Sequence, residues 1–209
     1  MSKTNEGWLE GWKTGQIGFH KTEFHSFLNS YFAQLSLESI HNVLVPLCGK
    51  SLDMIYLAEK GLDVTGVELS PIACQQFFED NQIEFTREGN QFTSKKITLL
   101  CGDLFEQELP KFDLIYDRAA YVALGPEVRK RYAELLRSSL TSSGQVLLTT
   151  FFHPDIKTGP PHSISDEEIT EFLRPQKLER LRQEDRPTPP RHQESGIETW
   201  QERAYLLKF

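Results

Sequence analysis

The sequence has few cysteines and no long apolar run, and each shortage excludes a class of protein. Only Cys48, Cys74 and Cys101 occur, and no two of them form a CxxC pair. They cannot all pair and lack the spacing of a zinc site, so we expect reduced thiols. The longest apolar runs, such as Val146 to Phe152, are far too short to span a bilayer. With no apolar stretch behind a basic start, we expect neither a signal peptide nor a membrane partner, and a cytoplasmic protein.

Basic residues are also in deficit. Lys and Arg number 23 against 30 Asp and Glu, a formal net charge of -7. Such a charge repels a phosphate backbone, and no run of Lys and Arg interleaves with aromatics, so we expect no nucleic-acid partner. His20 and His25 are five apart and lack a third ligand, so no metal site is predicted. We expect a monomer that acts on a small molecule.

The middle of the chain alternates between two patterns of apolar residues. Ser70 followed by Pro71 is typical of a helix start, with serine as the cap and proline at the first position. Alternation of strands with helices predicts a mostly parallel sheet covered on both faces. Strands are expected at 41–47, 64–67, 97–101, 112–116 and 145–152, and helices at 51–61, from 71, at 126–140 and from about 166.

The two ends of the chain differ from this alternation. Between residues 8 and 35, aromatic residues and leucines recur at spacings of three and four, which predicts two short helices. Near the C-terminus, strand-like stretches at 176–183 and 198–207 flank a Pro-rich loop without a helix between them. We therefore predict an α/β fold: a Rossmann-like, doubly wound, mostly parallel sheet that ends in an antiparallel hairpin. A single domain is expected, with an N-terminal helical cap at 1–40 and the Rossmann-like core at 41–209.

Three features fall at the carboxyl ends of the expected strands, where doubly wound sheets bind their ligands. They are the turn from Leu47 to Ser51, then Glu68, then Gly102-Asp103. Glu68 lies 19 residues past Gly49, the separation at which an acidic residue reaches the ribose hydroxyls of a nucleoside. A carboxylate suits that task because it accepts hydrogen bonds from both vicinal hydroxyls. An ordinary α/β turn without a ligand is the plainer interpretation.

The first turn favours a ligand that has no phosphate. It contains the single glycine Gly49, whereas dinucleotide sites use three to let the backbone approach a pyrophosphate. Pro46, Leu47 and Lys50 make a poor phosphate cradle. S-adenosylmethionine, with adenine and ribose but no phosphate, therefore fits better than NAD, and Asp103 is placed to hydrogen-bond its adenine region. An NAD-dependent oxidoreductase is the alternative from another enzyme class.

Five separated motifs, in order and at comparable spacings, extend over nearly the whole chain. They are Trp8-Leu-Glu-Gly-Trp12 with Phe19-His20, Pro46 to Lys50, Gly66 to Ser70, Phe112 to Arg118 with Ala119-Ala120, and Gly159-Pro-Pro161 with Arg191-His192 and Gly196-Ile197. Together they resemble the thiopurine S-methyltransferase family. The resemblance implies S-adenosylmethionine as cofactor and the sulfur of a small thiol, such as an aromatic thiol or a thiopurine, as methyl acceptor.

The resemblance also implies roles for individual residues. Arg118 and Arg191 would act at the acceptor, Arg118 first, by stabilising a thiolate or holding an anionic substrate. Phe19 would face the substrate as well as the cofactor, and the cap would close over the site. The implied cofactor contacts are Trp8, Trp12, Phe19, Leu47, Gly49, Glu68, Asp103, Leu104 and Arg118.

Each of these residues also has a plainer interpretation. Trp8 and Trp12 share a helix face and could be ordinary core residues rather than partners of a cationic cofactor. Arg118 could be a solvated ion-pair partner. Arg191 lies in a Pro-rich loop, where an exposed arginine is as common as a substrate contact.

The motifs depart from the family at two places on the substrate side. The family often has an aromatic residue after Gly-Pro-Pro, where this chain has His162. Mammalian members carry tryptophan after Arg-His, where this chain has Glu194-Ser195. These departures leave the acceptor open between a thiol and another soft species that contains selenium, tellurium or halide.

Overall fold

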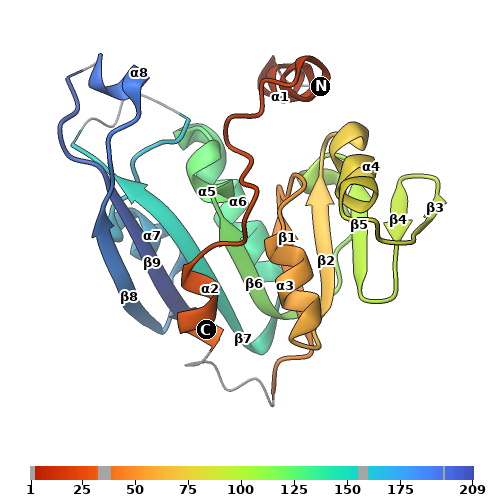
Figure 1. Ribbon diagram of the computed structural model, residues 1–209. Coiled ribbons are helices and arrows are strands. Elements are labelled where there is room, and N and C mark those ends of the chain that lie inside the picture. Colours follow the sequence, from red (N-terminus) through yellow and green to blue (C-terminus); the bar gives the residue numbers. More distant parts are fainter. Residues whose placement is uncertain (1–2, 33–38, 155–159, 195) are drawn as a thin grey trace. The chain divides into compact units, whose positions relative to one another are not determined.

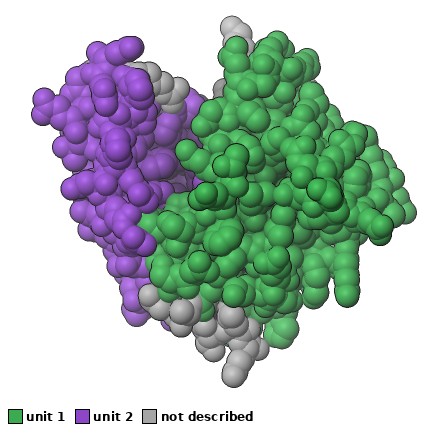
Figure 2. Space-filling view, viewed as in Figure 1, with its two compact units in different colours: residues 1–109 green, residues 110–209 purple. Residues whose placement is uncertain are grey.

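The computed structural model describes residues 3–32, 39–154, 160–194 and 196–209, and of Lys3, Thr4 and Arg191 only the backbone. The chain forms two compact units, residues 1–109 and residues 110–209, which Figure 2 colours separately. Among the described residues, no helix combines the length and the apolarity that a bilayer crossing requires.

Residues 1–109 contain strands in the order β3-β4-β5-β2-β1 (Figure 1). Strand β2 pairs in parallel with β1 and β5, which confirms the parallel sheet expected here. The antiparallel hairpin of β3 and β4 was not predicted, because three-residue strands around a turn at Gly89 are too short to show a period. The strands are β1 (Asn42–Pro46), β2 (Asp63–Glu68), β3 (Thr86–Glu88), β4 (Gln91–Thr93) and β5 (Ile97–Cys101).

The helices of this unit begin close to where the sequence predicted. Helix α4 starts at Pro71, and the Ser70 hydroxyl accepts the backbone N–H of Ala73 at 3.4 Å, so the serine cap and the first-position proline are confirmed. The N-terminal segment contains two short helices, as expected. The helices are α1 (Lys3–Thr14), α2 (Phe27–Phe32), α3 (Asp53–Glu59), α4 (Pro71–Asp80) and the 3-10 helix η2 (Leu104–Glu106).

Gly66, in the middle of β2, is packed so closely that no side chain fits. A Cβ atom there would lie 2.5 Å from a methyl carbon of Leu99 and 2.7 Å from the sulfur of Cys48. The missing side chain lets the turn after β1 lie directly against β2, and the backbone N–H of Cys48 donates to the carbonyl of Val67 at 3.0 Å.

We therefore expect Gly66→Ala to lower the free energy of unfolding by about 1 to 3 kcal/mol, the usual cost of overpacking a dense core. Gly7→Ala is the matched control, because a Cβ at Gly7 meets no atom within 4 Å. Urea unfolding of both variants measures the effect. A Gly66→Ala protein as stable as the Gly7→Ala protein would show that the contact relaxes at no cost.

Residues 110–209 contain strands in the order β6-β7-β9-β8. Strand β6 is parallel to β7, whereas β9 is antiparallel to both β7 and β8. The predicted C-terminal hairpin is therefore confirmed, and its second strand is the inner one. The strands are β6 (Phe112–Arg118), β7 (Leu140–Phe152), β8 (Lys177–Asp185) and β9 (Gln201–Lys208).

Two of the helices in this unit match the sequence pattern, and two are too short to have shown one. Helix α6 buries Arg129, whose guanidinium donates to both oxygens of Glu168 on α7 at 2.6 and 2.8 Å. This two-bond pair holds α6 against α7. The helices are α5 (Ala120–Ala123), α6 (Pro126–Ser138), α7 (Asp166–Leu173) and α8 (Pro190–Gln193).

Candidate functional site

Glu68 closes β2, and its side chain is buried. One carboxylate oxygen accepts the backbone N–H of Gly49 at 2.8 Å and the other accepts that of Ser70 at 2.7 Å. A carboxylate oxygen has two lone pairs, so these two hydrogen bonds do not saturate the carboxylate. One oxygen is fixed by the turn after β1 and the other by the residue that caps α4.

Burial raises the pKa of Glu68 to about 7, against the lowering effect of the hydrogen bonds from Ser70 and Gly49. A buried carboxylate is costly to ionise, and the backbone donors of Ser70, Gly49 and Leu69 offset only part of that cost. Near neutral pH the group therefore sits at the midpoint of its titration, and a ligand that donates hydrogen bonds would favour the ionised form.

The three cysteines lie around this carboxylate. Their thiols are buried and free, as the sequence predicted. The thiol of Cys74 donates to the carbonyl of Glu68 at 4.0 Å, and that of Cys101 donates to the carbonyl of Leu69 at 3.8 Å. Burial, with the nearby Glu68, raises the pKa of Cys48 well above its usual range, so Cys48 is a packing residue and not a nucleophile.

The turn after β1 has a conformation that brings its backbone toward Glu68. Leu47 and Gly49 have φ angles of +46° and +53°. Glycine adopts this left-handed conformation without strain. Beyond its conformation, Gly49 also lies against Trp12 of α1, whose ring carbon would be 3.3 Å from an added Cβ atom. Helix α1, which lies beyond the arrowhead of β2 in Figure 1, therefore packs directly on the turn that binds Glu68.

Three aromatic residues of the N-terminal segment, Trp8, Trp12 and Phe19, form one cluster. The ring of Phe19 meets Trp8 edge-on at 5.4 Å and Trp12 edge-on at 5.6 Å. Trp12 is 6% exposed, whereas Phe19 is 46% exposed. The two indoles therefore position the half-exposed ring of Phe19 beside the Gly49 turn. The exposed face of this ring is available to a ligand.

The turn after β5 contributes the remaining residues of the candidate site around Glu68. One carboxylate oxygen of Asp103 caps η2 by accepting the backbone N–H of Phe105 at 3.0 Å, and the other accepts the side-chain amide of Asn5 at 2.9 Å. Leu104 beside it is buried. Gly102 donates to the carbonyl of Glu68 at 2.9 Å, which ties this turn to the end of β2. Asn5 was missed by sequence reasoning, because an asparagine within a helix carries no signal of its own.

In residues 110–209, two predicted site residues lie in different elements. Arg118 is the last residue of β6, and Arg191 lies in α8, where only its backbone is described. Asp117 before Arg118 is completely buried and accepts the hydroxyl of Tyr132 at 2.7 Å and the backbone N–H groups of Ala120 and Tyr121 at 3.1 Å. Burial raises the pKa of Asp117 to about 6, and its three donors oppose that rise. Asp117 thus shapes the turn that follows Arg118, a role the sequence did not reveal.

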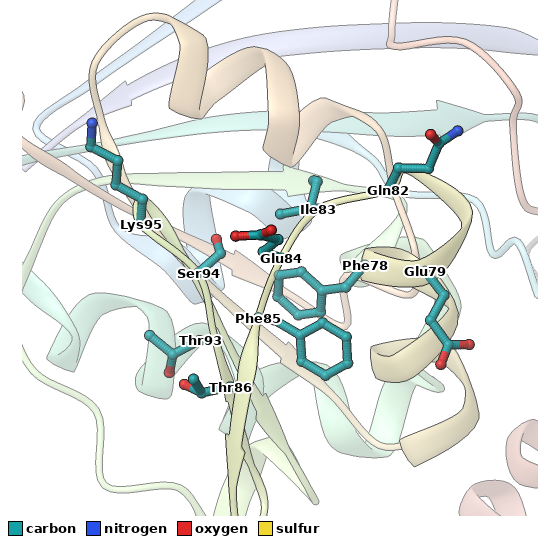
Figure 3. A pocket seen from close by; sticks show the side chains of 10 residues that line it. All are labelled: Phe78, Glu79, Gln82, Ile83, Glu84, Phe85, Thr86, Thr93, Ser94 and Lys95. Carbon is teal, nitrogen blue, oxygen red and sulfur yellow. The ribbon is translucent and has the colours of Figure 1, made fainter.

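An open groove of about 870 Å³ lies between the end of α4 and the β3–β4 hairpin, lined by residues such as Gln82, Phe85 and Lys95 (Figure 3). Lys95 precedes the start of β5, so the groove lies at the amino ends of the parallel strands. Ligands of doubly wound sheets bind at the carboxyl ends. The groove is therefore not the candidate site, and the cluster around Glu68 is.

Comparison with known proteins identifies the family of the chain. The profile of the thiopurine S-methyltransferase (TPMT) family matches residues 3–209. A thiopurine S-methyltransferase of Nitrosospira multiformis is 39% identical over 217 residues, which cover 97% of this chain and 96% of that protein. One from Shewanella baltica (strain OS155) is 40% identical over 214 residues, with coverage of 96% and 97%.

The fold is shared with a solved methyltransferase. The 1,6-didemethyltoxoflavin-N1-methyltransferase of Burkholderia thailandensis, solved with S-adenosylhomocysteine, has a TM-score of 0.63 and 16% identity over 98% of this chain and 87% of that one. A mixed α/β fold with a mostly parallel central sheet is thereby confirmed. The family decides against the NAD-dependent oxidoreductase. The chain belongs to the thiopurine S-methyltransferase family of S-adenosylmethionine-dependent methyltransferases.

Proposed function

We propose that this chain transfers a methyl group to the sulfur of a small thiol, such as an aromatic thiol or a thiopurine. The family carries the proposal, since relatives that span the whole chain at 35% to 40% identity are named for this reaction. The cofactor supplies a methyl group already activated on a sulfonium, so the protein has only to bind and orient both partners and to exclude water.

On the cofactor side, the proposal assigns the ribose to Glu68 and the adenine region to Asp103 with Leu104. Support comes from the two carboxylate oxygens of Glu68, which backbone donors fix at the carboxyl end of β2. The turn of Leu47 and Gly49 would lie under the methionine part. No run of backbone N–H groups is needed there, because the ligand has no phosphate.

The aromatic cluster would cover the sulfonium. Trp8, Trp12 and Phe19 present ring faces and edges, and a cation gains from lying over an aromatic face. The half-exposed ring of Phe19 supports a role at the boundary between cofactor and acceptor. The same contacts support the proposal that the N-terminal segment, residues 1–40, forms a cap over the cofactor.

On the acceptor side, the proposal gives Arg118 and Arg191 the task of holding the acceptor anion. A thiolate attacks better than a thiol, and a guanidinium nearby lowers the pKa of the thiol that it faces. An acidic aromatic thiol would then need no general base. Arg118 also contributes to the cofactor contacts in this proposal.

Because the pKa of Glu68 lies at about 7, we expect cofactor affinity to depend on pH. Ribose hydroxyls donate to the ionised carboxylate, so binding requires loss of the proton that the free protein holds below pH 7. The dissociation constant for S-adenosylhomocysteine should therefore rise about tenfold from pH 8 to pH 6. Calorimetry at both values measures it.

Glu68→Gln is the control for this pH dependence, because it binds more weakly but removes the titration. The buried Asp117 also titrates, near pH 6, and remains in both proteins. A wild-type affinity that is the same at pH 6 and pH 8, or an equal slope in Glu68→Gln, would contradict the role of the Glu68 carboxylate.

The proposed reaction is tested by measuring how fast S-adenosylhomocysteine forms from S-adenosylmethionine with each member of an acceptor panel. The panel contains aromatic thiols, thiopurines, selenium and tellurium oxyanions, and halides. We expect turnover with thiols that exceeds a reaction without acceptor by more than a hundredfold. Turnover confined to the selenium, tellurium or halide acceptors would replace the thiol with another soft acceptor. Tight binding of the cofactor without turnover of any acceptor would overturn the proposal.

A further inference from the structure

Three segments of residues 110–209 that are distant in sequence meet beyond the carboxyl end of β7. The register of the sheet pairs Phe152 with Gln201, and Gln201 with Asp185. The residue after β7, the residue before β9 and the loop after β8 therefore lie at one edge of the sheet. Figure 1 shows α8 at the end to which the arrowheads of β7 and β8 point. In an α/β sheet this is the edge at which ligands bind.

A buried aromatic cluster joins these segments. The imidazole of His153 lies parallel to the indole of Trp200, with centroids 4.7 Å apart and planes within 8°. The imidazole of His192 in α8 meets the same indole at 4.6 Å with its plane turned by 63°. The three side chains are only 1%, 3% and 2% exposed. The two imidazoles themselves lie 5.9 Å apart, with their planes at 62°. The histidine after β7, the tryptophan before β9 and the histidine of α8 therefore contact one another as a triangle of rings.

Hydrogen bonds to backbone groups connect the cluster to the segment around Ser163. The Ser163 hydroxyl donates to the carbonyl of His153 at 2.7 Å and accepts its backbone N–H at 3.0 Å. On the other side, the backbone N–H of Arg186 donates to the carbonyl of Trp200 at 2.8 Å, and the backbone N–H of Ile197 donates to the carbonyl of His192 at 3.1 Å. His153 and Trp200 therefore hold the segment around Ser163 and the loop that contains α8 in one arrangement.

The cluster places two polar imidazole rings in a buried position. Further along the same strands, the buried positions include aliphatic residues such as Leu147 and Leu206, together with Thr150 and Tyr205. Two imidazoles in the same place must be desolvated, which costs free energy that leucine would not. A flat stack fixes the direction of both rings, whereas aliphatic side chains can repack in several ways.

We propose that the stack of His153 on Trp200 positions the acceptor loops, namely residues 160–163 and the loop with α8 that carries Arg191. This inference rests on the proposed function, because Arg191 has to face the acceptor for the stack to affect catalysis. His153 and Trp200 are positioning residues in this arrangement. They set how well the acceptor binds and leave the cofactor site around Glu68 unchanged.

The test compares Trp200→Leu, which removes the stack, with Trp200→Phe, which keeps an aromatic face. We expect Trp200→Leu to raise the KM for the acceptor about tenfold and to change the dissociation constant of S-adenosylhomocysteine less than twofold. Trp200→Phe should recover most of the acceptor KM. Leu206→Ala, a buried change within β9, is the control for loss of stability alone and should leave the acceptor KM unchanged.

Amide hydrogen exchange supplies a readout that needs no acceptor. Residues 160–164 and 186–194 should exchange faster in Trp200→Leu than in Leu206→Ala, while α7 exchanges alike in both. Unchanged exchange in those two segments, or an acceptor KM that rises equally in Leu206→Ala, would overturn the positioning role. If the wild-type protein turns over no thiol, the proposed reaction fails, and the exchange rates still decide whether the stack orders the loops.

Discussion

Replacing Glu68 with alanine should weaken the binding of S-adenosylhomocysteine by about 1.5 to 3 kcal/mol, or roughly 10-fold to 150-fold. The carboxylate is held in place by the backbone of Gly49 and Ser70, and alanine removes both acceptor oxygens at once. Isothermal titration calorimetry measures the change directly.

Two further variants make this result specific to the ribose contact. Glu88→Ala removes an exposed glutamate from β3 and should leave the affinity unchanged. Glu68→Gln keeps the size of the side chain and one acceptor oxygen, so its affinity should lie between those of wild type and Glu68→Ala. Wild-type affinity in Glu68→Ala would show that the carboxylate only organises the turn at Gly49 and contacts no ribose.

Deleting residues 1–18 should lower kcat/KM about a hundredfold, a loss of about 2.7 kcal/mol of transition-state stabilisation. The deletion removes Trp12 from the Gly49 turn and Asn5 from Asp103, and it leaves Phe19 without its two indole partners. Water would then reach the reacting groups, which is the step that a cap prevents.

The effect on activity has to exceed the effect on folding for the cap to be functional. Phe24→Ala is a suitable control, because Phe24 lies in the same N-terminal segment but packs on Tyr56 of α3 at 5.1 Å. It should lower the melting temperature slightly and leave kcat/KM near the wild-type value. Full activity in the truncated protein would contradict the cap, and equal losses of activity and stability would reduce it to a structural role.

Much of the fold was predictable because local patterns and global structure agree. The run at 97–101 became β5 with the same bounds, and Ser70-Pro71 started α4, since capping and steric preferences act over a few residues. The β3–β4 hairpin, α5 and α8 were missed. The strands β3 and β4 have three residues each and the helices α5 and α8 have four each, so none spans two periods of the pattern on which the prediction depends.

The candidate cofactor site was predictable for a different reason. Carboxyl ends of parallel strands meet at one edge, so Gly49, Glu68 and Asp103 could be grouped from strand positions alone. Their hydrogen bonds confirm that Glu68 contacts the turn at Gly49 and that Gly102 beside Asp103 contacts Glu68. Whether they bind the cofactor as proposed stays a prediction that the Glu68 variants test.

The sequence by itself determined the family, the order of the longer strands and helices along the chain, and the spacing of Gly49 and Glu68, because these depend on residue type and separation. Only the tertiary structure decided that Asn5 reaches Asp103, that burial brings the pKa of Glu68 to about 7, and that His153 stacks on Trp200. The two contacts join residues that are 47 or more positions apart in the sequence, and the pKa of Glu68 depends on desolvation by the whole surrounding core. No local sequence pattern encodes either.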